Sequence, residues 1–128
     1  MATRYLVDTD VCVDYLPGLP QAAEWLEAVS GPALLSAVTV AELFAGVREG
    51  PERSRLGDFL GAFSIVPVDE HIAERGGLYR RDYRKSHATG LADALIAATA
   101  EAAQATLATL NETHFPMLAR VVVPYRKN

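Results

Sequence analysis

Near its N-terminus the chain reads Tyr5-Leu6-Val7-Asp8-Thr9-Asp10, three mainly apolar residues followed directly by an acidic segment. This order is typical of a short buried strand that ends at the edge of a sheet. Ala33-Leu34-Leu35 ends at Ser36 in the same way. Three further β-compatible stretches each stop before a Pro or an Asn: residues 65–66, 106–110 and 121–123. The sequence therefore predicts five short strands.

The residues between these strands have helical composition. They comprise 21–29, 38–47, 52–63, the long polar stretch 70–85, and 91–105, which is rich in alanine, the best helix former. Strands that alternate with helices indicate an α/β fold, with a mainly parallel central sheet of about five strands flanked by helices. The 128 residues contain no internal repeat and no linker, so we expect one domain over residues 1–128.

Composition excludes several classes of protein. Half of the residues are hydrophobic and the net charge is −4, which argues against a disordered chain and against a general nucleic-acid-coating protein. The lone cysteine, Cys12, cannot form an intramolecular disulfide and indicates a reducing compartment. The N-terminus lacks the apolar segment of a signal peptide. The apolar stretch 91–110 is interrupted by Asp93, Glu101 and Gln104, so we expect no membrane span and a cytoplasmic location.

Charge is unevenly distributed along the chain. No basic residue lies between Arg4 and Arg48, whereas residues 75–85 hold five of the twelve cations. If acids of the cation-free stretch converge in the fold, a bound metal would relieve their repulsion; the alternative is that most of them face water. The acids of that stretch are Asp8, Asp10, Asp14, Glu24, Glu27 and Glu42.

Three of the acids are candidates for a shared site. Asp8 follows the first predicted strand and Asn111 follows the fourth, and functional groups of α/β sheets gather beyond strand ends. Glu42 has small and apolar neighbours on its helix, as expected of a residue that faces a cleft. Asp93 opens the alanine-rich helix. Each residue has a simpler alternative: a polar turn for Asp8, a surface position for Glu42, and an interaction with the helix N-terminus for Asp93.

Several carboxylates in one place would hold a hard divalent cation such as Mg²⁺ or Mn²⁺. Such an ion activates water for in-line attack on phosphorus and stabilises the leaving oxygen. No His or Cys pair has zinc-ligand spacing, and no glycine-rich phosphate loop is present. A carboxylate metal site is therefore the one enzyme-like constellation in the sequence.

Four segments together resemble the motifs of PIN-domain nucleases, in the family's order and over essentially the whole chain. The size and the Phe115-Pro116 ending are most similar to VapC-type toxins of toxin–antitoxin pairs. The segments are Val7-Asp8-Thr9-Asp10-Val11, Ser36-Ala37-Val38-Thr39-Val40-Ala41-Glu42-Leu43 with Gly46, Leu91-Ala92-Asp93-Ala94-Leu95-Ile96-Ala97-Ala98-Thr99-Ala100, and Ala108-Thr109-Leu110-Asn111 with His114-Phe115.

This resemblance implies a Mg²⁺- or Mn²⁺-dependent endoribonuclease. Asp8, Glu42 and Asp93 would form the catalytic cluster, with Asp8 and Asp93 as metal ligands. Glu42 would complete the metal shell through water or orient the attacking water. Asn111 takes the fourth position, which is often acidic in the family; its oxygen can reach a metal but brings no charge, so one or two ions remain possible. Thr9 and Thr109 are candidate hydrogen-bonding supports, or else ordinary turn and strand hydroxyls.

The resemblance also implies partners: a homodimer, a small cognate antitoxin that covers the site, and DNA only through that antitoxin. A basic stretch before the third motif is a candidate grip for RNA phosphates, the alternative being a solvated helix face. The sequence does not specify the RNA or the cleavage site. The basic residues are Arg80, Arg81, Arg84 and Lys85.

Two rival interpretations remain open from the residues. Asp8-Thr9-Asp10 matches the start of the D-x-D motif of haloacid-dehalogenase phosphatases, but neither Lys85 nor Lys127 sits beside the downstream acidic pair of that fold. A PIN-like binding module, made catalytically weak by Asn111, would bind an antitoxin without cleaving RNA.

Overall fold

Five parallel strands form the central sheet in the order β3-β2-β1-β4-β5, as predicted for an α/β fold. The structure is a computed structural model that describes residues 3–31 and 33–127. Within these residues the strands are β1 (Tyr5–Val7), β2 (Ala33–Ser36), β3 (Ser64–Val66), β4 (Thr106–Ala108) and β5 (Val121–Val122).

The strand register aligns the carboxyl ends of the three central strands. Tyr5 of β1 lies opposite Ala33 of β2 on one side and opposite Thr106 of β4 on the other. Because all these pairings are parallel, the residues that follow β1, β2 and β4 emerge at the same edge of the sheet. That edge is where the acids after β1 and the polar residues after β4 meet.

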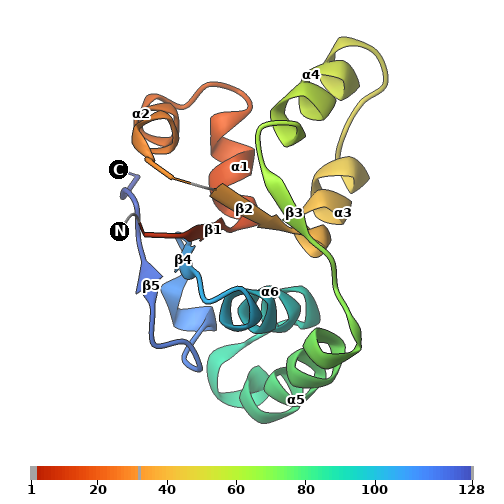
Figure 1. The fold of residues 1–128 in the computed structure, drawn as a ribbon, viewed down its shortest axis with the longest axis vertical. Helices are drawn as coiled ribbons and strands as arrows, with labels where there is room; N and C mark the ends of the chain where they lie inside the picture. The colour runs from red at the N-terminus through yellow and green to blue at the C-terminus, as the bar shows by residue number, and fades with distance from the viewer. Residues whose placement is uncertain (1–2, 32, 128) are drawn as a thin grey trace.

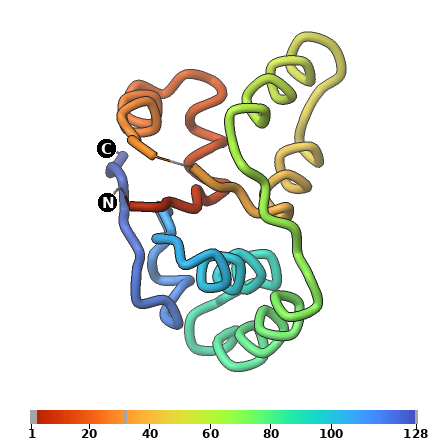
Figure 2. The backbone as a smooth tube through the Cα atoms, in the orientation of Figure 1, coloured from red at the N-terminus to blue at the C-terminus, as the bar shows by residue number. Residues whose placement is uncertain are grey.

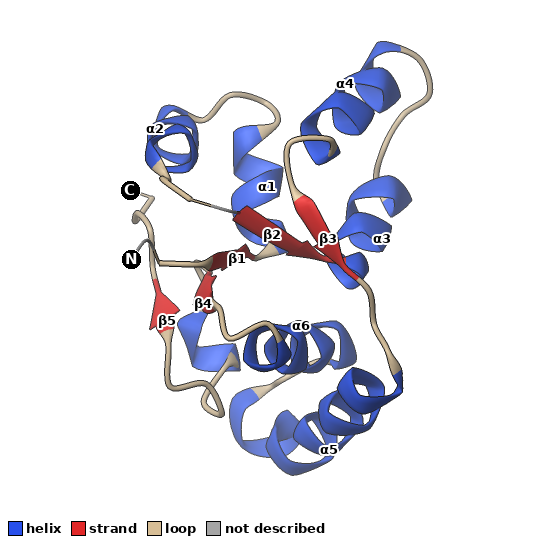
Figure 3. Cartoon of the chain, in the orientation of Figure 1, coloured by secondary structure: helices blue, strands red, loops and turns tan. Residues whose placement is uncertain are grey.

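Helices cover both faces of the sheet (Figure 1). One layer contains α1 (Thr9–Tyr15), α2 (Pro20–Ala28), α3 (Ala37–Ala45) and α4 (Pro51–Leu60), and the other contains α5 (Glu70–His87) and α6 (Leu91–Ala102). A 3₁₀ turn, η1 (Glu112–His114), follows β4. Figure 3 shows the strands as a layer between the two sets of helices, and in Figure 2 the two chain ends lie on the same side of the molecule.

Alternating side chains of the strands supply two hydrophobic cores. Leu6 and Leu34 face α5 and α6, whereas Val7 and Leu35, one residue further along, face α1, α3 and α4. Successive side chains of a strand point to opposite faces, so a continuous apolar strand can serve both layers. This burial on both faces explains why the strands read as unbroken apolar runs.

The main correction to the predicted elements is α1, which the sequence analysis did not anticipate. Its seven residues carry β-branched Val11 and Val13 and show no extended helical periodicity. The helix begins because Asp8, in an extended conformation, accepts a hydrogen bond from Thr9 N and acts as the N-cap. Packing of the buried Val11 and Cys12 against the sheet then outweighs their modest helix propensity.

The remaining corrections concern boundaries. The predicted strand 106–110 ends at Ala108, so Asn111 does not terminate β4 but lies three residues beyond it. The predicted helix 91–105 ends at Ala102, and Gln104 adopts a positive φ of 54° in the turn that follows. No helix within residues 3–31 and 33–127 combines the length and hydropathy required to cross a membrane.

Candidate active site

Asp8 is the most buried acid at the carboxyl edge of the sheet, and only 5% of its surface is exposed to solvent. Its Oδ1 accepts a hydrogen bond from Thr9 N at 2.8 Å, and its Oδ2 accepts one from the Thr109 hydroxyl at 2.7 Å. Burial, with the charges of Asp10 and then Asp93, raises the pKa of Asp8 to about 7 against the opposing effect of these hydrogen bonds. A nearby cation would therefore stabilise the ionised form of Asp8.

Glu42 reaches the same edge from α3, which begins where β2 ends. The Ser36 hydroxyl caps this helix by accepting a hydrogen bond from Val38 N at 3.0 Å. One turn into the helix, Glu42 Oε1 accepts a hydrogen bond of 2.6 Å from the hydroxyl of Thr9, the residue after Asp8. The buried Thr39 hydroxyl lies 3.0 Å from the same Thr9 oxygen. Thr9 thus joins the first two candidate acids.

Asp93 lies in the first turn of α6 and is half-buried. Its Oδ2 is 3.2 Å from Nδ1 of His114, which belongs to the turn after β4. Asp93 also contributes to the raised pKa of Asp8, so the negative charges of these two residues interact. Three segments that are distant in sequence therefore place Asp8, Glu42 and Asp93 around the carboxyl edge of the sheet.

Asp10 and Asn111 form a second polar group beside Thr109. Asp10 Oδ2 accepts hydrogen bonds from Leu110 N at 3.0 Å and from the Asn111 amide nitrogen at 3.3 Å. Burial raises the pKa of Asp10 as well. Its other oxygen, Oδ1, is buried and has no hydrogen-bond partner among the described residues. Asn111 therefore joins the site through Asp10, with its amide nitrogen directed at that carboxylate.

These residues suit a hard divalent cation in donor chemistry and in charge. Every donor is an oxygen, Asp8 is desolvated beside like charges, and Asp10 Oδ1 is an unpaired buried acceptor. Within residues 3–31 and 33–127, no Lys or Arg forms an ion pair with Asp8, Glu42 or Asp93. The same residues contain no set of three His, Cys, Asp or Glu side chains already spaced as ligands of one ion, so binding would require these side chains to adjust.

Two residues that contact this cluster were not among the predicted site residues. Thr39 was overlooked as a hydroxyl, although it lies three residues before Glu42 and hence on the same helix face. His114 was quoted within the fourth motif without a role, yet its ring contacts Asp93. No local pattern marks that contact, because it joins α6 to the turn after β4.

The predicted basic residues share one face of α5. Arg80, Arg81, Arg84 and Lys85 line a hollow of about 450 Å³ together with Gly77. Arg80 also donates a hydrogen bond of 3.2 Å to the carbonyl of Thr89, whereas Arg81 pairs with Asp82 at 2.8 Å. Their helix, α5, lies in the same layer as α6 (Figure 1), and α6 carries Asp93.

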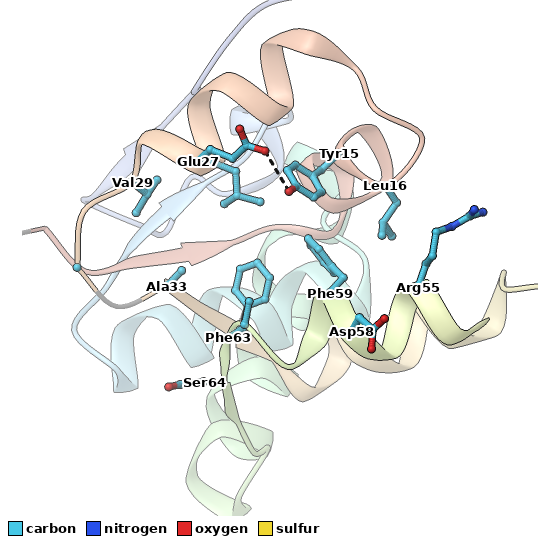
Figure 4. Close-up of a pocket in the computed structure, with 13 residues that line it drawn as sticks. Tyr15, Leu16, Glu27, Val29, Ala33, Arg55, Asp58, Phe59, Phe63 and Ser64 are labelled. Carbon is cyan, nitrogen blue, oxygen red and sulfur yellow. Dashed lines mark hydrogen bonds between the residues drawn. The ribbon is translucent and has the colours of Figure 1, made fainter. Parts of the chain in front are cut away.

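Two apolar hollows lie on the opposite layer. The first, of about 690 Å³, lies between the α1–α2 region and α4; Figure 4 shows Phe59 and Phe63 at its centre, with Glu27, Arg55 and Asp58 around them. The second, of about 460 Å³, is lined by α1, α3 and α4 and includes Glu42. Leu16 and Arg55 line both hollows, and Glu42 is the candidate acid that lines the second.

Curated proteins and a family description match nearly the whole chain. The family model described as PIN domain matches residues 5–121. Ribonuclease VapC10 of Mycobacterium tuberculosis is 43% identical over 123 residues, which cover 94% of this chain and 92% of that protein. Ribonuclease VapC19 of the same organism is 42% identical over 125 residues, covering 94% of this chain and 98% of that protein.

Solved structures match the fold over a similar extent. A toxin–antitoxin complex from Klebsiella pneumoniae has a TM-score of 0.83 at 30% identity and covers 96% of this chain and 99% of the matched chain. VapBC2 from Rickettsia felis, bound to a DNA fragment from its promoter, has a TM-score of 0.79 at 27% identity and covers 94% and 98% of the two chains. The matches in sequence and the matches in structure thus both extend over nearly all of this chain.

Proposed function

Because this chain belongs to the PIN-domain family, we propose that it is an endoribonuclease and the toxin of a type II toxin–antitoxin pair. The observation that carries the proposal is the gathering of Asp8, Glu42 and Asp93 at one edge of the sheet. The curated relatives named ribonucleases support the activity. The family also decides against the phosphatase alternative.

We propose Mg²⁺ or Mn²⁺ as the cofactor, held by Asp8 and Asp93. When bound, such an ion shields phosphate charge and stabilises the leaving oxygen of phosphodiester hydrolysis. The all-oxygen donor set and the raised pKa of Asp8 support a hard cation. Asn111, which is directed at Asp10, would support the site through that residue.

The chain's own residues position the reactants. Thr9 N and the Thr109 hydroxyl fix the two oxygens of Asp8, so this side chain is oriented before substrate arrives. Glu42 is exposed and anchored through the Thr9 hydroxyl, and it would accept the proton of the attacking water. The water oxygen then bonds to phosphorus, one ester P–O bond breaks, and the released oxygen takes up a proton.

We propose that the basic face of α5 holds RNA phosphates. Its four cations occupy helical spacings of three and four residues, which place them on one side of the helix. No carboxylate of the described residues lies within ion-pair distance of Arg84 or Lys85. Free cations on one face form the electrostatic footprint expected of an RNA-binding surface.

We propose that a cognate antitoxin binds the two apolar hollows, which share Leu16 and Arg55 in their linings. The similar solved structures include toxin–antitoxin complexes, which supports a protein partner of this kind. A segment that fills both hollows would extend from Phe59 and Phe63 to Glu42 and would block substrate there. DNA contact would then come through the antitoxin, and binding to the protein encoded by a neighbouring reading frame would show the interaction.

A homodimer and a cytoplasmic location complete the proposal. Large apolar side chains that remain exposed, among them Phe44, Ile65 and Leu91, are available for self-association. Sedimentation of the purified protein would give its oligomeric state. The cytoplasm is where an RNA-cleaving toxin would meet its substrate. One domain over residues 1–128 also stays a prediction.

The decisive experiment is RNA cleavage by the purified protein with Mg²⁺, with Mn²⁺ or with EDTA. We expect cleavage with either ion and none with EDTA. Asp8→Asn and Asp93→Asn should each lower the rate by roughly 100-fold or more, because each removes a charged ligand. Asp58→Asn, at an exposed acid of α4, is the matched control and should retain wild-type activity. Cleavage that persists in EDTA, or that neither site variant affects, would refute the proposal.

A further inference from the structure

Asp93 is held less firmly than Asp8 by its local structure. The N-cap of its helix is Gly90, which offers no side chain, and the Gly90 N–H lies 3.5 Å from Asp93 Oδ2, at the outer limit of a hydrogen bond. Asp8, in contrast, accepts two hydrogen bonds shorter than 2.9 Å. The helix N-terminus alone therefore does not fix the Asp93 carboxylate.

His114 supplies the shorter contact. Its Nδ1 lies 3.2 Å from Asp93 Oδ2, within ion-pair distance of that carboxylate oxygen. The two side chains are 36% and 28% exposed, so the contact is partly shielded from water. A polar side chain in contact with a metal-ligating carboxylate helps to orient that ligand.

The position of His114 is itself fixed by backbone interactions. Its N–H donates to the carbonyl of Asn111 at 3.0 Å, and its carbonyl accepts a 2.8 Å hydrogen bond from the hydroxyl of Thr89. Thr89 is fully buried in the loop between α5 and α6, and its own carbonyl accepts a hydrogen bond from Arg80. The turn therefore keeps its place without the imidazole, which leaves the ring available for Asp93.

We infer that His114 is a positioning residue, which orients Asp93 for a divalent cation through its Nδ1–H. The inference rests on the proposed function, because it assigns a second residue to the proposed metal ligand. The inference gives the two parts of His114 different roles. Its backbone holds the turn in place, and its ring orients Asp93.

Binding of Mn²⁺ alone, followed by the paramagnetic resonance of the free ion, tests the inference without RNA. We expect His114→Ala to weaken Mn²⁺ binding by about 10- to 100-fold, the usual effect of removing a residue that supports a ligand. His114→Asn should restore binding close to wild type, because its amide nitrogen takes the place of Nδ1. His71→Ala, at an exposed histidine of α5, should bind Mn²⁺ as the wild type does.

Urea unfolding in EDTA completes the experiment. The His114 variants should unfold at the wild-type midpoint, since the turn is held by its backbone. Wild-type affinity in His114→Ala, weak binding in His114→Asn, or a loss of binding that follows a loss of stability would each overturn the inference. If the wild type itself neither binds Mn²⁺ nor cleaves RNA, both proposals fail; if it does both and His114→Ala matches it, this inference alone fails.

Discussion

Asp8 serves the backbone and the candidate site at the same time. It ends β1, it caps α1 through Thr9 N, and it presents a carboxylate to the edge where Glu42 and Asp93 lie. The position carries a cost, because burial beside Asp10 favours the neutral acid. A cation offsets this cost and so couples metal binding to protein stability.

The pKa of Asp8 predicts a specific pH dependence of stability. The folded protein binds a proton at Asp8 as the pH falls through about 7, whereas an unfolded aspartate does so near its ordinary value of 3.8. The stability due to the protonated form is therefore lost as the pH rises through about 7. Asp8→Asn has no charge to bury. In EDTA, the free energy of unfolding of the wild type should fall relative to this variant by roughly 2–3 kcal/mol between pH 5 and pH 8.

Urea titrations at the two pH values measure this difference, and Mn²⁺ should restore more stability to the wild type at pH 8 than at pH 5. Titrating groups that do not interact with Asp8 contribute equally to both proteins, so their effects cancel in the comparison. Parallel pH profiles would show that Asp8 ionises normally in the fold.

At the scale of elements, the packing of α5 on α6 sets where Asp93 lies. The two helices approach closely at Gly76: a Cβ there would lie 2.6 Å from Leu95 Cδ2 and 3.1 Å from Leu95 Cα. The side-chain atom can move, but the backbone atom belongs to the helix that carries Asp93. Gly76 therefore permits the helix spacing, whereas a Cβ at Gly77 meets no atom within 4 Å.

These neighbouring glycines provide a matched pair of substitutions. Gly76→Ala should destabilise the protein by about 1–3 kcal/mol, because the extra methyl overpacks the helix contact. Gly77→Ala should stabilise it by up to about 1 kcal/mol, since alanine is the better helix former and has free space here. Urea unfolding measures both. Equal effects of the two substitutions would mean that the close approach of α5 and α6 does not constrain the fold.

At the scale of the whole molecule, charge is segregated although the net charge is only −4. Acids collect at the carboxyl edge of the sheet, and the basic face of α5 lies on one layer. Residues of α1 and α4 contribute to the apolar hollows, and these helices lie in the other layer (Figure 1). Substrate and antitoxin would thus approach from different layers and compete only near Glu42.

Neutralising the basic face tests the RNA surface separately from catalysis. The triple variant Arg81→Gln, Arg84→Gln and Lys85→Gln should bind RNA more weakly in EDTA, where no cleavage occurs. The slope of the logarithm of its RNA-binding constant against the logarithm of the salt concentration should become shallower by roughly 0.7 for each lost phosphate contact. Arg80 stays unchanged because it holds the Thr89 carbonyl.

The control carries Arg48→Gln, Arg53→Gln and Arg120→Gln, three exposed cations outside α5 that line neither apolar hollow. It should keep wild-type affinity and salt dependence. An equal loss in both variants would show that RNA responds to net charge and not to this face.

Short stretches of sequence are enough to predict the local features of this fold. Short apolar stretches that stop at a polar residue or a proline indicated all five strands, and alanine content indicated α6, because burial and helix propensity act over a few neighbours. The acids after β1 and in the first turn of α6 were likewise visible as candidates. The short helix α1 was not, since its cap and its packing outweigh the propensity of β-branched residues.

Which of these residues meet depends on the packing of the strands and helices. The strand order β2-β1-β4 joins Thr109 to Asp8 across 101 residues, and the parallel edge brings Thr9 to Glu42. The turn after β4 places His114 against Asp93, and no spacing of residues in the sequence predicts this contact. Local pattern fixes what a segment becomes, whereas the packing of the segments fixes which side chains share a site.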